Sequence, residues 1–261
     1  MILVVFLGAV VGGVLGLTGA GGGILAVPAL VFGLGWSVAQ AAPTALLAVT
    51  AAALVGATEG HWRGLVRYRA ATVIALVGAG VTPVGLRVAQ ILPARWLLII
   101  FALTMLGVAL RLLHPQGGRT TQEPQCRINP ETGRLHWTFA SAFCLAGLGA
   151  LTGFLTGLLG VGGGFVIVPA LRRLTDISMH GIIATSLMVI TLVGSGAVLA
   201  SVIHGHLLPL RVAMPFLAAT AAGMLLGRLS AHRFSHEHLQ RLFAGVLVIV
   251  AASMLIKAIL I

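Results

Sequence analysis

A glycine-rich stretch of fifteen residues occurs twice in this chain. Residues 16–30 read GLTGAGGGILAVPAL, and residues 157–171 read GLLGVGGGFVIVPAL. The matches continue on both sides at nearly one spacing, so that equivalent positions hold Gly8 and Gly149, Gly12 and Gly153, Thr44 and Thr185, and Phe101 and Phe243. Chance does not produce such a series. The chain is therefore an internal duplication, and its fold must combine two copies of one unit.

The composition places this duplicated unit in a membrane. Of 261 residues, 59% are hydrophobic and 8% are charged, and the mean hydropathy is +1.09. A water-soluble domain of this composition would expose large apolar surfaces. The apolar runs are long enough to cross about 30 Å of hydrocarbon and lack the alternation of an outer-membrane barrel. We expect an all-α polytopic protein in the lipid bilayer, and we expect the first helix to be retained, because no basic region precedes it.

Each half of the chain contains five apolar segments. They lie near residues 2–17, 21–34, 37–58, 69–89 and 94–113, and near residues 136–158, 162–175, 178–203, 208–228 and 238–260. Between the halves the sequence is rich in Pro, Gly and charged residues, which is typical of a water-exposed linker. This division predicts an N-terminal repeat over 1–113, a linker over 114–135 and a C-terminal repeat over 136–261.

The basic residues predict how these segments are oriented. If every segment crosses, one side of the membrane receives Arg63, Arg67, Arg69, Arg111, Arg119, Arg127, Arg134, Arg172, Arg173, Arg228, Arg233 and Arg241. The other side receives Arg87, Arg95, Arg211 and Lys257. The positive-inside rule then makes the linker cytoplasmic and places both termini outside. With five segments per half, the two repeats become inverted copies, as in many secondary transporters.

The same rule accounts for the net charge of +11, so we expect no nucleic-acid partner. The expected location is the cytoplasmic (inner) membrane of a prokaryote. The charge count leaves one alternative open, in which the first two segments of each half form a hairpin that returns to its own side. The segment between Gly21 and Gly35 covers only about 20 Å, so we expect the glycine turns to lie within the membrane.

The glycines predict two different structures. Gly8, Gly12 and Gly16 and their copies recur every four residues, which lets a neighbouring helix approach closely. Clustered glycines instead predict a helix break, at Gly19, Gly21, Gly22 and Gly23 and at Gly160, Gly162, Gly163 and Gly164. Broken backbone at membrane depth requires protein or a wet cavity around it. A helix that restarts there offers N–H groups and a positive dipole end, so we predict an anion site formed by both breaks, with a purely structural turn as the alternative.

The two glycine-rich stretches resemble the paired signatures of the TauE/SafE sulfite exporter family. GVTPVGLRVAQILPARWLLIIFAL and AAGMLLGRLSAHRFSHEHLQRLFAG resemble the helix-loop-helix that closes each half in that family. The resemblance covers nearly the whole chain. Because members of the family are implicated in moving sulfite and organosulfonates such as sulfoacetate, it implies an anion transporter without specifying the anion.

Four hydroxyl side chains complete the predicted substrate site. The family often has Thr, Ser or Asn at the start of the third segment, where this chain has Thr44 and, in the second half, Thr185 and Ser186. Thr18 is a further candidate beside the first glycine cluster. Hydroxyls of this kind can bind sulfonate oxygens, but in membrane helices they more often donate to carbonyl groups of their own helix.

Titratable residues supply few alternatives. Glu59 and Asp176 lie near segment ends, where an acidic side chain more often reaches water than takes part in proton coupling. His61, His204 and His206 make proton coupling a hypothesis. The cluster of His232, His236 and His238 lacks carboxylate or thiolate partners, and Cys126 and Cys144 lie in unlike surroundings, so we expect no metal, disulfide or cofactor. Arg87 and Arg228 suit anchoring at the interface better than guiding of anions.

Together these features predict a secondary transporter that carries a small sulfur-containing oxyanion, sulfite or an organosulfonate, by alternating access. A passive anion channel is one alternative, and a histidine-dependent membrane enzyme is another. The direction of transport and the oligomeric state stay open, with a homodimer as one option.

Overall fold

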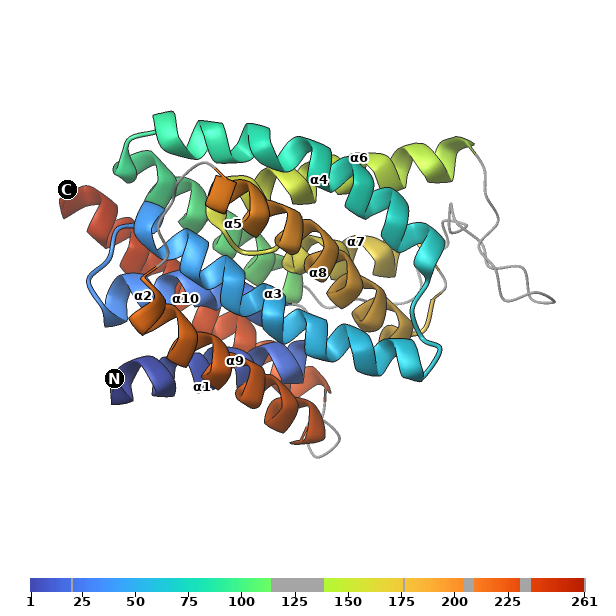
Figure 1. Ribbon diagram of the computed structural model, residues 1–261, viewed down its shortest axis with the longest axis horizontal. Helices are drawn as coiled ribbons and strands as arrows, with labels where there is room; N and C mark the ends of the chain where they lie inside the picture. Colours follow the sequence, from blue (N-terminus) through green and yellow to red (C-terminus); the bar gives the residue numbers. More distant parts are fainter. Residues whose placement is uncertain (20, 114–138, 176, 204–208, 231–235, 261) are drawn as a thin grey trace.

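The computed structural model describes residues 1–19, 21–113, 139–175, 177–203, 209–230 and 236–260, and the elements of the described chain are helices joined by short turns (Figure 1). The first half contains α1 (Ile2–Thr18), η1 (Gly22–Leu25), α2 (Ala26–Gly33), α3 (Val38–Trp62), α4 (Tyr68–Ile91) and α5 (Ala94–Leu113). The second contains α6 (Phe139–Leu159), α7 (Gly164–Leu174), α8 (Met179–Ile203), α9 (Leu210–Ser230) and α10 (His236–Leu260). Each predicted apolar segment overlaps one of these α-helices, although α3 continues four residues past the predicted end at residue 58.

Seven of these helices are long and apolar enough to cross a membrane: α3, α4, α5, α6, α8, α9 and α10. Their surfaces carry many exposed large apolar side chains, including Leu76 and Ile249, which suits contact with lipid rather than water. The prediction of an all-α polytopic membrane protein is confirmed.

The first two segments of the chain form a hairpin. The chain turns at Gly19 and comes back along α1, so that Gly33 at the end of α2 lies beside Leu7. In the second half, Gly163 lies against Thr152 and Thr156 of α6. The returning helices span only about 20 Å and 17 Å, which is less than the roughly 30 Å of a hydrocarbon core. The glycine turns therefore lie inside the protein, as a hairpin arrangement requires.

The halves are joined crosswise through glycines. A methyl group on Gly12 of α1 would overlap the Thr220 carbonyl of α9, and one on Gly153 of α6 would overlap the Gly78 carbonyl of α4. The contacts along each pair advance in the same direction, because Gly8 meets Phe216, Gly16 meets Met224, Gly149 meets Ile74 and Gly157 meets Thr82. The two helices of each pair are therefore parallel, and equivalent glycines make equivalent contacts in the two pairs. The prediction that these glycines allow close helix approach is confirmed.

Equivalent helices of the two halves run antiparallel. Along the contact of α3 with α8, Thr50 meets Gly194, while Gly60 meets Ala184. The start of α10 likewise lies beside the end of α5, where the Gln240 amide donates to the Leu112 carbonyl at 2.8 Å.

The molecule has two distinct ends (Figure 1). Both termini lie at the left of the figure, together with the start of α3. The turn between α3 and α4 and the start of α6 lie at the right. We call these the terminal end and the turn end.

The close glycine contact predicts a position-dependent effect of alanine on stability. Gly153→Ala should lower the melting temperature in detergent, because relieving its overlap with the Gly78 carbonyl costs about 1–3 kcal/mol. Gly147→Ala on the same helix is the matched control, because no atom lies within 4 Å of the added methyl group. Its melting temperature should be unchanged or slightly raised, since alanine favours helix. Equal losses in both variants would contradict the packing argument.

Candidate functional site

The two glycine breaks lie next to each other at the centre of the protein. A methyl group on Gly23 would lie 3.0 Å from the Val49 side chain and 3.2 Å from the Val161 carbonyl oxygen of the second break. One on Gly162 would lie 3.5 Å from the same valine and 3.0 Å from Ile190. Val49 is near the middle of α3, so both breaks lie at the level of the middle of this long helix.

The first break is fixed by its own hydroxyl and by a left-handed glycine. Gly19 has a φ of 83° and donates its N–H to the Leu15 carbonyl at 2.8 Å. The Thr18 hydroxyl donates to the Val14 carbonyl at 2.7 Å and accepts the Gly22 N–H at 3.0 Å. The chain then restarts as the 3-10 helix η1 and not directly as an α-helix after Gly23, and the Thr18 hydroxyl holds the first residue of η1, Gly22, close to α1.

The second break uses more glycine conformations. Gly160, Gly162 and Gly163 have φ values of 69°, 80° and 63°, a region that side chains with Cβ rarely adopt. Gly164 then begins α7 directly. The predicted helix break is confirmed in both halves. The glycines of the first break are also tightly surrounded, since Gly21 lies against Phe243 and Gly22 lies against the backbone of Leu15.

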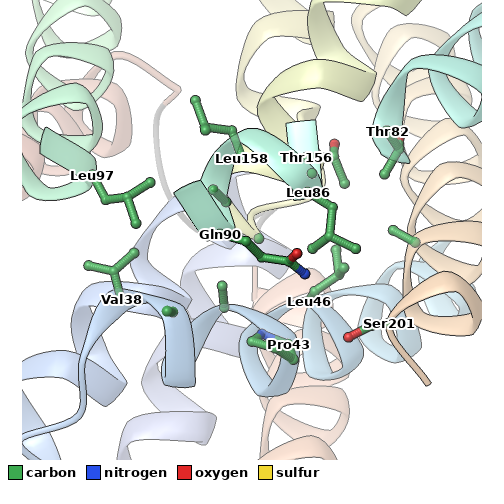
Figure 2. A pocket seen from close by; sticks show the side chains of 16 residues that line it. Val38, Pro43, Leu46, Thr82, Leu86, Gln90, Leu97, Thr156, Leu158 and Ser201 are labelled. Carbon is green, nitrogen blue, oxygen red and sulfur yellow. The ribbon is translucent and has the colours of Figure 1, made fainter. Parts of the chain in front are cut away.

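A cavity of about 80 Å³ lies beside the second break, toward the terminal end (Figure 2). It is lined by the start of α3, the end of α4, the end of α6, the end of α8 and one residue of α5, and its lining includes the exposed residues Ala39 and Gln90. The lining residues are Val38, Ala39, Ala42, Pro43, Leu46, Thr82, Leu86, Ala89, Gln90, Leu97, Thr156, Gly157, Leu158, Gly160, Ala197 and Ser201. Both halves of the chain therefore contribute to its wall.

The cavity wall carries neutral polar groups. In Figure 2 the Gln90 amide and the Ser201 hydroxyl point into the space between the labelled side chains. Ser201 is 4% exposed, and its Oγ has no hydrogen-bond partner within the described chain. Thr44, next to Pro43 in the cavity wall, is fully buried, and its Oγ1 also lacks a partner there. A buried polar group without a partner costs about 1–3 kcal/mol, so the Ser201 hydroxyl, which is in the cavity wall, indicates a place for a ligand or water.

The other predicted hydroxyls already bond to their own helices. The Thr185 hydroxyl donates to the Gly181 carbonyl at 2.7 Å and accepts the backbone N–H of Arg67 at 3.0 Å. The Ser186 hydroxyl donates to the Ile183 carbonyl at 3.0 Å. These bonds, like that of Thr18, are the ones expected of hydroxyls that stabilise helix ends and turns.

Of the predicted residues, the structure thus brings Gly160 to the cavity wall. Thr44 directly follows the lining residue Pro43 but does not line the cavity, and the other predicted residues lie around the central breaks or at the turn end. Sequence reasoning missed Gln90, Ser201, Thr82 and Thr156 in the cavity wall. The only signal for them was a polar residue in an otherwise apolar segment. Such residues are common, and many bond to their own helix, as Thr82 and Thr156 do at 2.7 Å.

The titratable candidates lie away from the cavity. Glu59, at the turn end of α3, forms ion pairs with Arg63 at 2.9 Å and with Arg228 of α9 at 2.6 Å. His61 contacts the Tyr68 hydroxyl through Nδ1. Within the described chain, no group of three His, Cys, Asp or Glu side chains is placed to hold a metal. Asp176, Cys126, His204, His206 and His232 and the side chains of His236 and His238 lie outside the described residues.

Comparison of the sequence with known proteins gives matches over nearly the whole chain. A family model described as Sulfite exporter TauE/SafE matches residues 4–254. The chain is 33% identical over 254 residues to a "Probable membrane transporter protein" of Xylella fastidiosa strain 9a5c, and the match covers 97% of this chain and 93% of that protein. A protein of the same name from strain Temecula1 is 32% identical over 256 residues, with the same coverage. No solved structure matches.

These matches, with the apolar helices, define an integral membrane transporter and not an enzyme. The chain belongs to the TauE/SafE sulfite exporter family. The resemblance inferred from the glycine-rich stretches is confirmed.

The hydrogen bonds of Thr18 predict which substitution damages the first break. Thr18→Val should lower stability by about 1 kcal/mol, because it removes the acceptor for the Gly22 N–H. Thr18→Ser keeps the oxygen and should retain most of the melting temperature. Thr104→Val on α5 is the control, because that hydroxyl donates only to the Phe101 carbonyl of its own helix. A Thr18→Ser variant as unstable as Thr18→Val would contradict this role.

Proposed function

We propose that the protein is a secondary transporter that moves a small sulfur-containing oxyanion, sulfite or an organosulfonate, across the cytoplasmic membrane by alternating access. The observation that carries this proposal is the cavity with the buried Ser201 hydroxyl in its wall. The family description, which names sulfite export, supports the choice of anion.

The chemistry of the cavity suits an oxyanion held by neutral donors. None of the described lining residues is charged, so hydroxyl and amide N–H groups would replace the hydration shell of the anion. Hydrogen bonds to a charged group are worth about 1.5–3 kcal/mol each, more than neutral ones. Ser201 and Gln90, which both line the cavity, are the donors we assign. The start of α7 after Gly163 adds a positive dipole end at the neighbouring break.

The arrangement of the halves supports alternating access. The antiparallel course of α3 and α8 is what an inverted repeat requires, and transporters of that kind bind substrate where the repeats meet. Positive charge at the turn end supports a cytoplasmic position for it, since Arg63, Arg67 and Arg69 lie in or next to the α3–α4 turn. The terminal end, with both termini, then faces outward.

Uptake of radiolabelled sulfite into proteoliposomes tests this function. We expect saturable uptake above that of protein-free liposomes, and an increase in KM of about tenfold or more for Ser201→Ala, because one hydrogen bond to the anion is lost. Ser195→Ala on the same helix is the control, since that exposed hydroxyl donates to the Leu192 carbonyl at 3.0 Å.

The outcomes separate the alternatives. Competition by sulfate, thiosulfate, sulfoacetate or taurine identifies the preferred anion. Unsaturable flux with single-channel currents would establish a passive channel instead. No sulfite uptake, or a KM unaffected by Ser201→Ala, would refute the proposed substrate or the proposed site. An imposed pH gradient that leaves uptake unchanged would dismiss proton coupling.

A further inference from the structure

The duplication allows the two ends of the protein to be compared position by position. The cavity is lined by residues whose counterparts in the other half lie at the turn end. Equivalent pairs are Gly160 and Gly19, Ala42 and Ile183, Leu46 and Leu187, Ala197 and Gly56, and Leu86 and Arg228. The last pair is supported by packing, because a methyl group on Gly157 would lie 2.8 Å from the Leu86 backbone nitrogen, and one on Gly16 would lie 2.8 Å from the Arg228 backbone nitrogen.

Large side chains fill the counterpart of the cavity at the turn end. A methyl group on Gly160 would lie 2.5 Å from the Ala42 side chain, and one on Gly19 would lie 2.5 Å from the Ile183 side chain. Both glycines are therefore closely packed, but the side chain that Gly19 meets is the larger one. Gly56 is also closely packed, because a methyl group on it would lie 2.5 Å from the Met224 side chain and 2.7 Å from the Leu187 side chain. Leu187 and Met224 are fully buried. The same set of positions therefore forms a cavity at one end and a closed contact at the other.

An ion pair spans the closed contact between the halves. Arg228 of α9 places Nε 2.6 Å from Oε2 of Glu59 on α3, and its Nη1 lies 3.5 Å from the Gly56 carbonyl oxygen. The two side chains are 19% and 30% exposed, so water screens the pair less than it screens a surface pair. At the cavity end, the counterparts of these charges are Leu86 and Ala200, which cannot form an ion pair.

We propose that Glu59 and Arg228 form the gate that holds the turn end closed while the cavity exists at the terminal end. The proposal rests on the proposed transport function, in which substrate released at the turn end must pass this contact. Arg63 pairs with the same carboxylate at 2.9 Å but lies on the same helix, so it cannot hold two helices together. Breaking only the pair between helices should therefore shift the population toward an open turn end.

Thiol labelling of the full-length protein in detergent tests the gate. In a background carrying Cys126→Ser and Cys144→Ala, Leu187→Cys places a reporter in the closed contact, and Ser201→Cys places one in the cavity. With the gate intact, a water-soluble maleimide should label position 187 slowly. Glu59→Gln or Arg228→Gln should increase that rate at least about tenfold, as expected for a shift in the open population. The charge swap Glu59→Arg with Arg228→Glu should restore slow labelling.

Controls and opposite outcomes keep the test decisive. Arg63→Gln should leave labelling at 187 unchanged, and the gate variants should not increase labelling at 201. A rate at 187 that is unaffected by Glu59→Gln would overturn the gate. Equal increases at 187 and 201 would also overturn it, because they show general loosening. No substrate is present, so failure of sulfite uptake and failure of the gate are observed separately.

Discussion

The close backbone approach of α1 to α9 and of α4 to α6 is the contact on which the remaining structure depends. In each pair, glycines bring one helix against carbonyl groups of the other, as Gly153 does against Gly78. Helices in lipid gain little from the hydrophobic effect, so their association relies on such dense van der Waals packing. Because each pair joins one helix from each half, the two copies are interlocked and meet at the centre.

This interlocking explains why the broken helices are tolerated. The breaks at Gly19 and Gly160 expose backbone that could not face lipid, and the crossing helices α3 and α8 enclose them from both sides. Val49 contacts both breaks, which links the returning helices of the two halves. A rearrangement of one half relative to the other would therefore change the packing at both glycine turns, which is the coupling that the proposed alternating access requires.

The duplicated halves are alike in backbone packing and unlike in side chains. Thr44 and Thr185 occupy equivalent positions, yet Thr185 accepts an N–H from Arg67, while Thr44 is left without a partner beside the cavity. Ala42 lines the cavity, while its larger counterpart Ile183 packs against Gly19. Similar backbone contacts with different side-chain volumes thus produce a cavity at one end and an ion-paired contact at the other.

The sequence by itself determined the membrane class, the duplication, the helical segments and the two glycine breaks, because hydropathy, spacing and backbone freedom are local properties. It also led to the family. Only the tertiary structure decided which polar residues meet: Gln90 and Ser201 lie in segments far apart in the chain, and Glu59 meets Arg228 across the two halves. Hydroxyl groups in membrane helices look alike in sequence whether they bond to their own helix or face a cavity. Their role is set by the volumes and directions of neighbours that only the folded chain brings together.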